Sequence, residues 1–551
     1  MWGDLDPWMV SLWSSLLELK PLPPGTIVDD TPRLEPAAFT ITPFSPPPPQ
    51  PTPLKMSKGI QEFWESVAPP RGRDGQQHPG GAPMPGRLAV NRRLTADDHF
   101  QDVRHFEVDV MGVPGGADYR AGDVAWVHPR NDQSVVETFA RVMDLRLDQI
   151  MGIAPAASPA CGQEEGGRYD VTHENLPTAV AGGADLLPPD GCRRRWLSPP
   201  FFLPLVCSMR SLLGEVLDIS GTPRRAFFET LSLFATDEVE REKLVELSSP
   251  DGADLLYEYA TREKRTYVEV LGDFPSCKVP LKRLLQLIPR LRPRGFSIAS
   301  SSLETPWRLH LCVAVVAFRT PYKRARTGVC SSWLASLEPG AEVPLSIRPG
   351  TFKLPESLDH PLIMVGPGTG VAPMRSVVLE RSRRRRRRQE SGLGLELGVP
   401  EPGVGDGIDL FTGGRQGRGG GGRSSVLPDT LFFGCRYQRK DFLYGEEWEK
   451  MSKTGNLALH VAFSRENPNP NGGRVYVQRR LREQSESLAR LIVDRGANVL
   501  VSGSAKQMPM DVREAFRDAI ATHDKVDGVA GAEVILKMME KKGRYCVEAW
   551  S

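Results

Sequence analysis

The spacing of apolar residues divides the chain into three kinds of segment. In residues 87–131, short stretches alternate apolar and polar positions, as in HFEVDVMGV and GDVAWVHP, which predicts strands joined by turns. From about 208 to 291 apolar residues recur at helical spacing, and strand patterns return at RGFSIAS and RLHLCVAVVAF. After Pro361, the apolar strands PLIMVG, TLFFGC, LALHVAF and NVLVSG alternate with helical stretches, which is typical of a parallel sheet with crossover helices.

This order predicts a fold class that combines α/β with all-β structure. We expect an antiparallel β-barrel over residues 88–350 with a helical insertion at about 208–290, followed by a doubly wound parallel-sheet domain over 351–551. No apolar run reaches the roughly 18 residues that a membrane-spanning helix needs. The first residues also lack the basic and apolar regions of a signal peptide. A membrane protein is therefore not expected.

Glycine and proline are abundant, with 53 and 49 among 551 residues, and they gather in a few segments. We interpret 21–87 as a Pro/Gly-rich linker, and about 152–200 and about 381–427 as disordered insertions. The second insertion opens with an arginine block at 383–388. Such a block favours a solvated, self-repelling surface loop, although Arg/Gly-rich tracts can also bind nucleic acid.

Charge and cysteine content exclude several classes of protein. The 70 Lys and Arg residues nearly balance the 68 Asp and Glu residues, and the net charge of +2 argues against a surface devoted to nucleic acid. The eight cysteines include no CxxC pair, which indicates reduced thiols and predicts neither a disulfide framework nor a bound metal.

The sharpest local signal is the glycine-rich sequence VGPGTGVAP at 365–373, which includes Gly368, Thr369 and Gly370. It follows an apolar strand and precedes a helical pattern. Glycines there let the backbone approach a pyrophosphate, and the helix N-terminus supplies N–H donors. A tight turn without a ligand remains the alternative.

A second polar group follows the strand LALHVAF. It consists of Ser464, Arg465, Arg474, Tyr476 and Gln478. In a dinucleotide-binding fold, the end of this strand faces the adenosine ribose, where arginine accommodates the 2′-phosphate of NADP. These residues therefore favour NADPH, whereas an ordinary solvated loop is the alternative.

Two further segments are compatible with a second nucleotide. Arg294 and Phe296 offer a charge for a phosphate and an aromatic face for a ring system. The small-residue turn at 328–334 opens a predicted helix that could hold a pyrophosphate. The alternative is a core phenylalanine and a helix N-cap at Ser331.

Taken together, the ordered motifs RxFS, GxCSS, GPGTGVAP, FFGCR, SR…VYVQ and a terminal aromatic residue resemble a known family. The chain resembles the NADPH-dependent diflavin oxidoreductases, which share a ferredoxin–NADP reductase-like FAD/NADPH module. The phrases RPRGFSIASS, GVCSSWLASL, VGPGTGVAP and AFSRE carry the resemblance most specifically. It covers about 88–551, apart from the two insertions.

The resemblance implies a role for each matching residue. The residues implied to bind FAD are Lys264, Arg265, Arg294, Gly295, Phe296, Ser297, Gly328, Val329, Cys330, Ser331 and Trp550. Those implied to bind NADPH are Gly368, Thr369, Gly370, Ser464, Arg465, Arg474, Val475, Tyr476, Val477, Gln478 and Asp511. Ser297, Cys435 and Glu548 would lie beside the reacting carbon, and Trp550 would stack on the flavin and swing away as a gate. Judged alone, Cys435 is more often a plain buried thiol than a participant, and only the resemblance favours a functional role.

The resemblance also implies an activity and a location. NADPH would reduce FAD, and electrons would pass singly through FMN to a cytoplasmic iron–sulfur assembly protein. Residues 1–20 resemble only the last helix of a flavodoxin-like FMN domain, so we expect most of that domain to be absent here. A single-flavin reductase for diffusible acceptors and a non-catalytic scaffold are the alternatives. Specific nucleic-acid binding is not expected.

Overall fold

The computed structural model describes residues 37, 39–43, 84–110, 119–155, 206–390, 427–466 and 473–550. The chain forms two compact units. The first contains residues 133–290 together with the described residues before 67, and the second contains 68–132 and 291–551. The expected remnant of a flavodoxin-like domain at 1–20 lies outside the described residues, as do 156–200 and 391–426.

The first unit packs helices against a small antiparallel sheet. The sheet has the order β1-β5-β6, with strands β1 (Phe39–Pro43), β5 (Ile150–Pro155) and β6 (Val206–Ser208). The helices are α3 (Gln133–Val142), α4 (Met209–Ser211), α5 (Arg225–Ser232), α6 (Glu238–Ser248), α7 (Ala253–Leu256), α8 (Tyr267–Asp273) and α9 (Leu281–Leu287), with π-helical turns η1 (Leu212–Val216) and η2 (Tyr257–Arg262). Local signals fix their starts, as at α8, where Thr266 and Glu269 form a reciprocal capping box. Apolar side chains from helices and β5 share one buried core.

This unit corrects three expected boundaries. The unit begins at Gln133 with α3, so the insertion into the barrel is larger than the helical segment expected at 208–290. Strand β5 includes the first residues of the segment expected to be disordered from about 152. Strand β1 lies within the expected linker. Its apolar and polar residues alternate, and it pairs with β5, which lies far along the chain.

The second unit begins with a closed antiparallel barrel. Its strands are β2 (Met84–Arg93), β3 (Val103–Asp109), β4 (Val124–Val127), β7 (Arg294–Ser297), β8 (Arg308–Ala314) and β11 (Glu342–Arg348), in the order β7-β4-β11-β2-β3-β8. The edge strands meet just beyond β7, where Ile298 pairs with Leu311. Alternation along β3 places Phe106 in the apolar barrel core and His105 on the opposite face.

A short hairpin and a helix extend from the barrel. The hairpin consists of β9 (Ala317–Arg319) and β10 (Ala325–Thr327). Helix α10 (Val329–Ser336) follows it directly and leads into β11.

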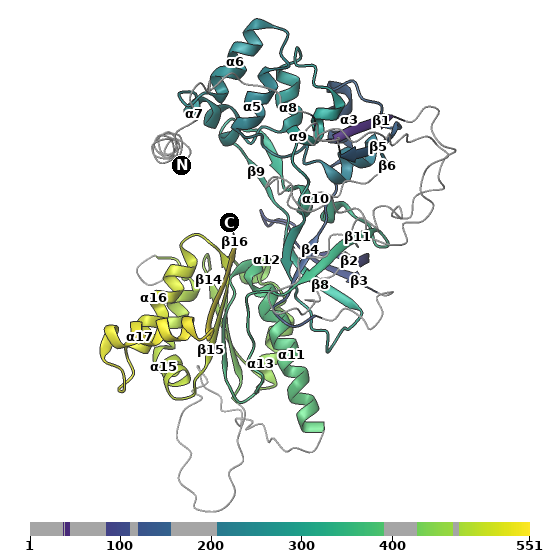
Figure 1. The fold of residues 1–551 in the computed structure, drawn as a ribbon. Coiled ribbons are helices and arrows are strands. Elements are labelled where there is room, and N and C mark those ends of the chain that lie inside the picture. The colour runs from purple at the N-terminus through teal and green to yellow at the C-terminus, as the bar shows by residue number, and fades with distance from the viewer. Residues whose placement is uncertain are drawn as a thin grey trace, which may run out of the picture. The chain divides into compact units, whose positions relative to one another are not determined.

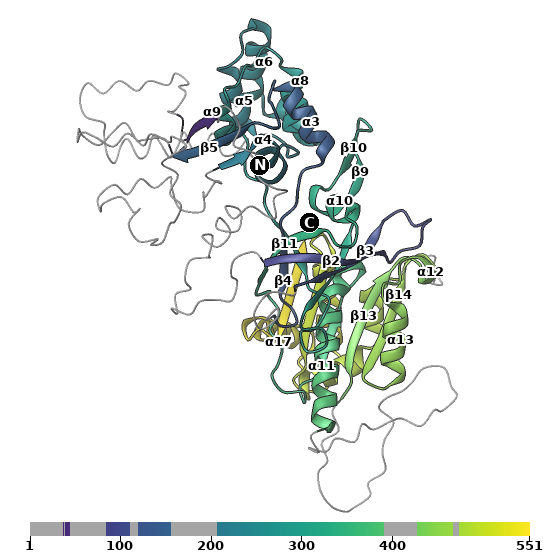
Figure 2. The ribbon, with the colours of Figure 1, turned by 90° about the vertical axis from the view of Figure 1, so that its right-hand side faces the viewer.

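The rest of the second unit is a parallel sheet covered by helices on both faces. The strands are β12 (Leu362–Val365), β13 (Asp429–Cys435), β14 (Leu457–Phe463), β15 (Asn498–Ser504) and β16 (Tyr545–Trp550), in the order β14-β13-β12-β15-β16. Helices α14 (Val477–Glu483), α15 (Ser485–Val493), α16 (Met508–Ile520) and α17 (Gly528–Lys541) form one core with the sheet. Helices α11 (Val371–Glu390) and α13 (Gly445–Lys453) form the other, and α12 (Gln438–Asp441) is a short turn. Figures 1 and 2 show these two helical layers.

This sheet confirms the predicted fold class of an antiparallel β domain followed by a doubly wound α/β domain. The four apolar segments expected as strands are β12 to β15. The fifth strand, β16, was not predicted, and it carries the C-terminal candidates of the site. None of the described helices is both long and apolar enough to cross a membrane.

Helix α11 overturns the interpretation of the arginine block as a loop. The helix continues through the block to Glu390. Arg381 and Arg385 lie one helical turn apart on the face toward the sheet, and both pair with Asp429, which is fully buried on β13. Spacing of i, i+4 puts these two arginines on one helical face, so they find a carboxylate that local sequence does not reveal.

Candidate active site

The first part of the site is strand β7, which carries Arg294, Gly295, Phe296 and Ser297. The strand pairs with β4, and Gly295 lies opposite Trp126. A Cβ at Gly295 would come within 3.4 Å of the Trp126 ring, so the glycine allows close packing there. Phe296 is half-buried and packs at the edge of the barrel core, which makes it part of that core as well as a candidate ring contact.

The second part is the turn that opens α10. Gly328 is the N-cap of this helix, and a Cβ there would lie 2.7 Å from Ser331 Oγ and 2.8 Å from Val316 Cβ. The Ser331 hydroxyl accepts a hydrogen bond from the Val316 N–H at 3.0 Å and lies inside the helix. Ser331 is therefore not the N-cap, contrary to the alternative suggested by the sequence. Burial raises the pKa of Cys330 to about 12, which leaves this thiol neutral and packed in the core.

The third part is the glycine-rich turn between β12 and α11, which contains the 3-10 turn η3 (Gly368–Gly370). Gly368 has φ of +57°, a left-handed conformation that favours glycine. A Cβ on Gly370 would lie 2.1 Å from the Ser502 carbonyl oxygen, so β15 and this turn touch through their backbones. Ser502 Oγ is buried without a hydrogen-bond partner among the described residues. The turn thus combines a close backbone approach with an unsatisfied polar atom.

Ser297 and Glu548 are brought together from distant parts of the second unit's sequence. The Ser297 hydroxyl lies near the Glu548 carboxyl group. Burial raises the pKa of Glu548, and the nearby Ser297 hydroxyl partly offsets that rise. Glu548 Oε2 is buried and has no partner among the described residues. Glu548 lies in register with Ser502 on β15, so two unsatisfied oxygens occur on neighbouring strands.

Trp550 ends β16 and pairs in register with Ser504. Its side chain is 40% exposed, which is unusual for such a large apolar ring. A free aromatic face is what a stacking role would require. This exposure is compatible with that role.

Cys435 lies at the end of β13 and is buried. Burial raises the pKa of its thiol, and nearby Asp441 and Glu466 raise it further. Its Sγ lies 3.8 Å from the Tyr437 carbonyl oxygen. The thiol is thus held neutral, which suits a packing or orienting group and opposes a thiolate nucleophile.

The candidate residues for the 2′-phosphate follow strand β14. The N–H of Ser464 donates to the Cys435 carbonyl at 2.9 Å and that of Arg465 to the Arg436 carbonyl at 3.0 Å. Within the described ranges, the guanidinium groups of Arg465 and Arg474 have no hydrogen-bond or ion-pair partner. Both charges are consequently available for an anion.

Gln478 and Asp511 form a polar pair next to this loop. Gln478 Nε2 donates to Asp511 Oδ2 at 3.1 Å, and Gln507 Nε2 donates to Asp511 Oδ1 at the same distance. Tyr476 is 45% exposed. The side chains of Val475 and Val477 are buried in the core, so any ligand contact at those positions must use the backbone.

Lys264 and Arg265 lie in the first unit. Arg265 pairs with Asp273 and lies over the Tyr259 ring, at 4.3 Å from its centroid. Lys264 has φ of +48°. Within that unit Arg265 is already paired, so a role in phosphate binding would require it to exchange partners.

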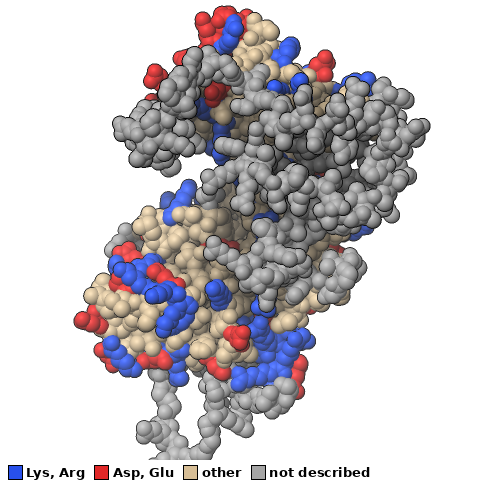
Figure 3. All heavy atoms as spheres, in the orientation of Figure 1, with Lys and Arg blue, Asp and Glu red and all other residues tan. Residues whose placement is uncertain are grey.

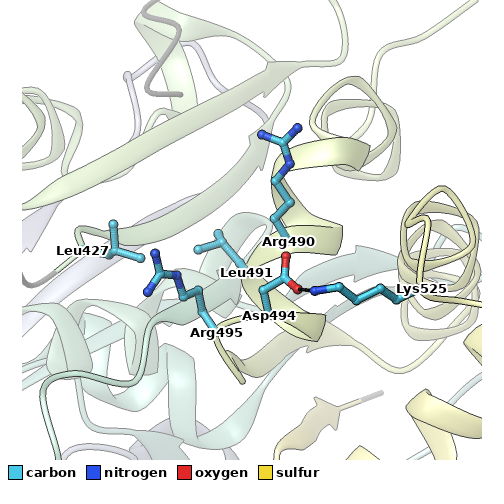
Figure 4. A pocket seen from close by; sticks show the side chains of 6 residues that line it. All are labelled: Leu427, Arg490, Leu491, Asp494, Arg495 and Lys525. Carbon is cyan, nitrogen blue, oxygen red and sulfur yellow. Dashed lines mark hydrogen bonds and ion pairs between the residues drawn. The ribbon is translucent and has the colours of Figure 1, made fainter. Parts of the chain in front are cut away.

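A hollow of about 520 Å³ lies elsewhere on the second unit and contains no candidate site residue. Figure 4 shows its lining, formed by Leu427, Arg490, Leu491, Asp494, Arg495 and Lys525. Asp494 already pairs with Lys525 at 2.6 Å. On the face seen in Figure 3, basic and acidic side chains are interspersed.

Several residues that belong to this region were missed by sequence reasoning. They are Arg375, Ser376, Tyr444 and Glu447, which connect α11 and α13 to the barrel. Arg375 lies two residues after the recognised glycine motif, but only its partners reveal its importance.

Two family models match the chain. One, described as an FAD binding domain, covers residues 81–333, and the other, described as an oxidoreductase NAD-binding domain, covers 427–514. The matched ranges include the Gly328 turn and the polar residues that follow β14. The fold and site therefore define a flavin- and nicotinamide-nucleotide-dependent oxidoreductase.

Full-length comparison with curated proteins narrows this class. The chain is 35% identical to NADPH-dependent diflavin oxidoreductase 1 of Danio rerio, 34% to that of Bos taurus and 33% to that of Arabidopsis thaliana. These alignments cover 99–100% of this chain and 76–77% of each relative. The chain belongs to the NADPH-dependent diflavin oxidoreductase family. It is an oxidoreductase that uses FAD and NADPH and transfers electrons from NADPH to the flavin.

Proposed function

We propose that Ser297, Cys435, Glu548 and Trp550 form the reaction centre of this oxidoreductase. The observation that supports this proposal best is the proximity of Ser297 on β7 to the Glu548 carboxyl group on β16. It joins the barrel, which the FAD-binding match covers, to the parallel sheet, which carries the nicotinamide-nucleotide match. When bound, NADPH and FAD supply the hydride chemistry themselves.

The residues present fit both cofactors. The Gly328 turn has no room for a side chain and opens a helix, which suits a pyrophosphate. Gly370 likewise leaves no room for a side chain, and the turn that contains it opens helix α11. The buried unpartnered oxygens of Ser502 and Glu548 offer polar atoms to a ligand at the second turn. We assign the first turn to FAD and the second to NADPH.

In this arrangement Ser297 would orient the nearby Glu548 carboxyl group, and the unpartnered Oε2 would face positive charge on a bound ring. The exposed indole of Trp550 would cover a bound flavin and would move aside for the nicotinamide. Arg465 and Arg474 bind the 2′-phosphate, with Ser464, Tyr476 and Gln478 around the ribose. Cys435 contributes shape at the reacting carbon as a neutral thiol.

We further propose that the electrons leave one at a time for an iron–sulfur protein through FMN. The support is the relatives' printed name, diflavin oxidoreductase, together with the family's role that the motifs imply. A cytoplasmic location follows from the same resemblance.

The first experiment is anaerobic addition of NADPH to the purified full chain. We expect a yellow protein with an FAD spectrum, and we expect its flavin absorbance to bleach after NADPH is added. A chain without flavin, or with flavin that NADPH does not bleach, would support the non-catalytic scaffold instead. Reduction of ferricyanide but not of an iron–sulfur protein would favour the single-flavin reductase.

The second experiment tests the 2′-phosphate assignment. Arg465→Asp should weaken NADPH binding by about 10–100-fold and improve the relative use of NADH, because it replaces the partner of a phosphate with a repelling charge. Arg495→Asp is the matched control, since Arg495 lines the separate hollow of Figure 4. An unchanged preference for NADPH over NADH in Arg465→Asp would show that Arg465 does not bind the 2′-phosphate.

A further inference from the structure

Arg375 is a buried arginine in the first turns of α11, just after the glycine-rich turn. Its Nε donates to Glu447 Oε2 at 2.8 Å and its Nη2 to Glu447 Oε1 at 2.9 Å. The arginine side chain is 8% exposed and the glutamate 38%. This two-bond fork fixes the plane of the guanidinium group, because both donors and both acceptors are used at once.

The remaining edge of the guanidinium group faces the barrel. Arg375 Nη1 donates to the Ala299 carbonyl at 2.7 Å, and the adjacent Ser376 Oγ donates to the Ser300 carbonyl at 2.5 Å. Ala299 and Ser300 directly continue the segment that carries Ser297. The start of α11 therefore holds the backbone just beyond the serine that lies near Glu548.

Tyr444 supports the guanidinium group from one face. The ring centroid lies 4.7 Å from Arg375 Cζ, and the hydroxyl lies 2.9 Å from His105 Nδ1. Tyr444 has φ of +58°, a conformation that costs a bulky residue about 1–3 kcal/mol. Such a conformation persists because the arginine and histidine contacts hold the ring in place.

Two histidines on the outer face of the barrel complete the contacts. His310 Nδ1 lies 3.2 Å from Arg375 Nη1, and because arginine only donates, Nδ1 accepts and Nε2 carries the proton. Burial and the charge of Arg375 lower the pKa of both His105 and His310, so both are neutral. One nitrogen of each histidine and a carboxylate oxygen of Glu107 lie within 4.8 Å of one another. The proton on His310 Nε2 and the Arg308 bond to Glu107 oppose a metal ion there.

We propose that Arg375 is a positioning residue, which sets the spacing between the glycine-rich turn at the start of α11 and the strand that carries Ser297. This inference rests on the proposed function, in which the turn binds NADPH and the strand carries Ser297 of the reaction centre. A displacement of about 1 Å between reacting groups can slow a transfer by about 100-fold. A rigid fork that joins both elements directly controls that distance.

The test uses the full chain with bound FAD and the substitution Arg375→Lys, which keeps the charge but loses the fork. We expect the single-turnover rate of flavin reduction by saturating NADPH, per bound FAD, to fall at least about 10-fold. The dissociation constant for NADP⁺ should change by less than about 2-fold, since Arg375 itself is assigned no contact with the nucleotide and the lysine keeps its charge. A purely structural role would not separate these two quantities.

Arg513→Lys is the matched control. Arg513 makes the same kind of fork, with Glu533, at 3.0 and 2.8 Å, but it lies on α16 and has no contact with β7. We expect its rate of flavin reduction to equal that of the unchanged chain.

Amide hydrogen exchange just after Ser297 provides a second measurement that does not depend on activity. The N–H of Ile298 donates to the Asp123 carbonyl and that of Ala299 to the His310 carbonyl, at 3.0 and 2.8 Å. We expect a peptide covering these amides to exchange faster in Arg375→Lys and at the same rate in Arg513→Lys.

The outcomes separate the two proposals. If NADPH does not reduce the unchanged chain, the proposed function fails. If it does, and Arg375→Lys shows the same rate and the same exchange, the positioning role fails. If Arg375→Lys purifies without flavin, Glu447→Gln decides by the same measurements, because it weakens the fork and leaves Arg375 in place. A slower reduction supports the role, and an unchanged one overturns it.

Discussion

The two halves of α11 use buried arginines in different ways. In the first half, Arg375 pairs with a partly exposed glutamate and binds backbone beside the candidate reaction centre. In the second half, Arg381 and Arg385 share Asp429, whose side chain is 1% exposed. In the first arrangement Arg375 Nη1 binds the candidate functional segment, whereas in the second the arginines pair with a carboxylate in the protein core. The difference indicates that the first half serves the site and the second half serves stability.

Removal of Asp429 should have the largest effect on stability. Asp429→Ala leaves two buried guanidinium groups without a counter-charge, and we expect a loss of about 3–5 kcal/mol in the free energy of unfolding. Denaturant unfolding of the flavin-loaded chain would measure it. If the second half of α11 serves only stability, the reduction rate per bound FAD should stay unchanged.

Gly370→Ala should disturb the turn before the first half of α11. The new Cβ would lie 2.1 Å from the Ser502 carbonyl oxygen, so the backbone must shift, at a cost of about 1–3 kcal/mol. Titration with NADP⁺ should show binding weakened by about 10-fold or more. Gly214→Ala is the control, since a Cβ there meets nothing within 4 Å. Normal NADP⁺ binding by Gly370→Ala would show that this turn does not bind the nucleotide.

Glu548→Gln should change how stability depends on pH. Burial places the pKa of Glu548 in the folded chain above its unfolded value, so the folded state binds the proton more tightly. The resulting stabilisation is present below the unfolded pKa and is lost as pH rises through the folded pKa. The glutamine variant should lack this loss, so its unfolding midpoint should fall less on going from acid to neutral pH. Parallel pH curves for the two proteins would contradict the assigned burial.

The smallest effect is expected at the exposed end of α11. Arg388 pairs with Asp359 at 3.2 Å, and their side chains are 36% and 50% exposed. Arg388→Gln should therefore lower the free energy of unfolding by only about 0.2–1 kcal/mol, and less at high salt. A loss comparable to that of Asp429→Ala would erase the distinction between buried and exposed members of the arginine block.

The arginine block also shows where sequence reasoning fails. Six consecutive arginines repel one another in an isolated segment, so a solvated loop was the expected outcome. The helical repeat instead directs Arg385 toward a carboxylate on a strand that follows more than forty residues later. Local composition cannot reveal that partner, because the pairing depends on the order of strands in the sheet.

The fold class, the strands β12 to β15, the two glycine turns and the family could be predicted from the sequence, because each depends on short-range spacing or ordered motifs. The closure of the barrel at Ile298 and Leu311, the fifth strand β16, and the proximity of Ser297 to Glu548 could not, because they depend on how distant segments assemble. The same holds for the contact of Arg375 with Ala299. These contacts join residues far apart in the chain, and their free energy comes from burial and paired polar groups that exist only once the sheets have assembled.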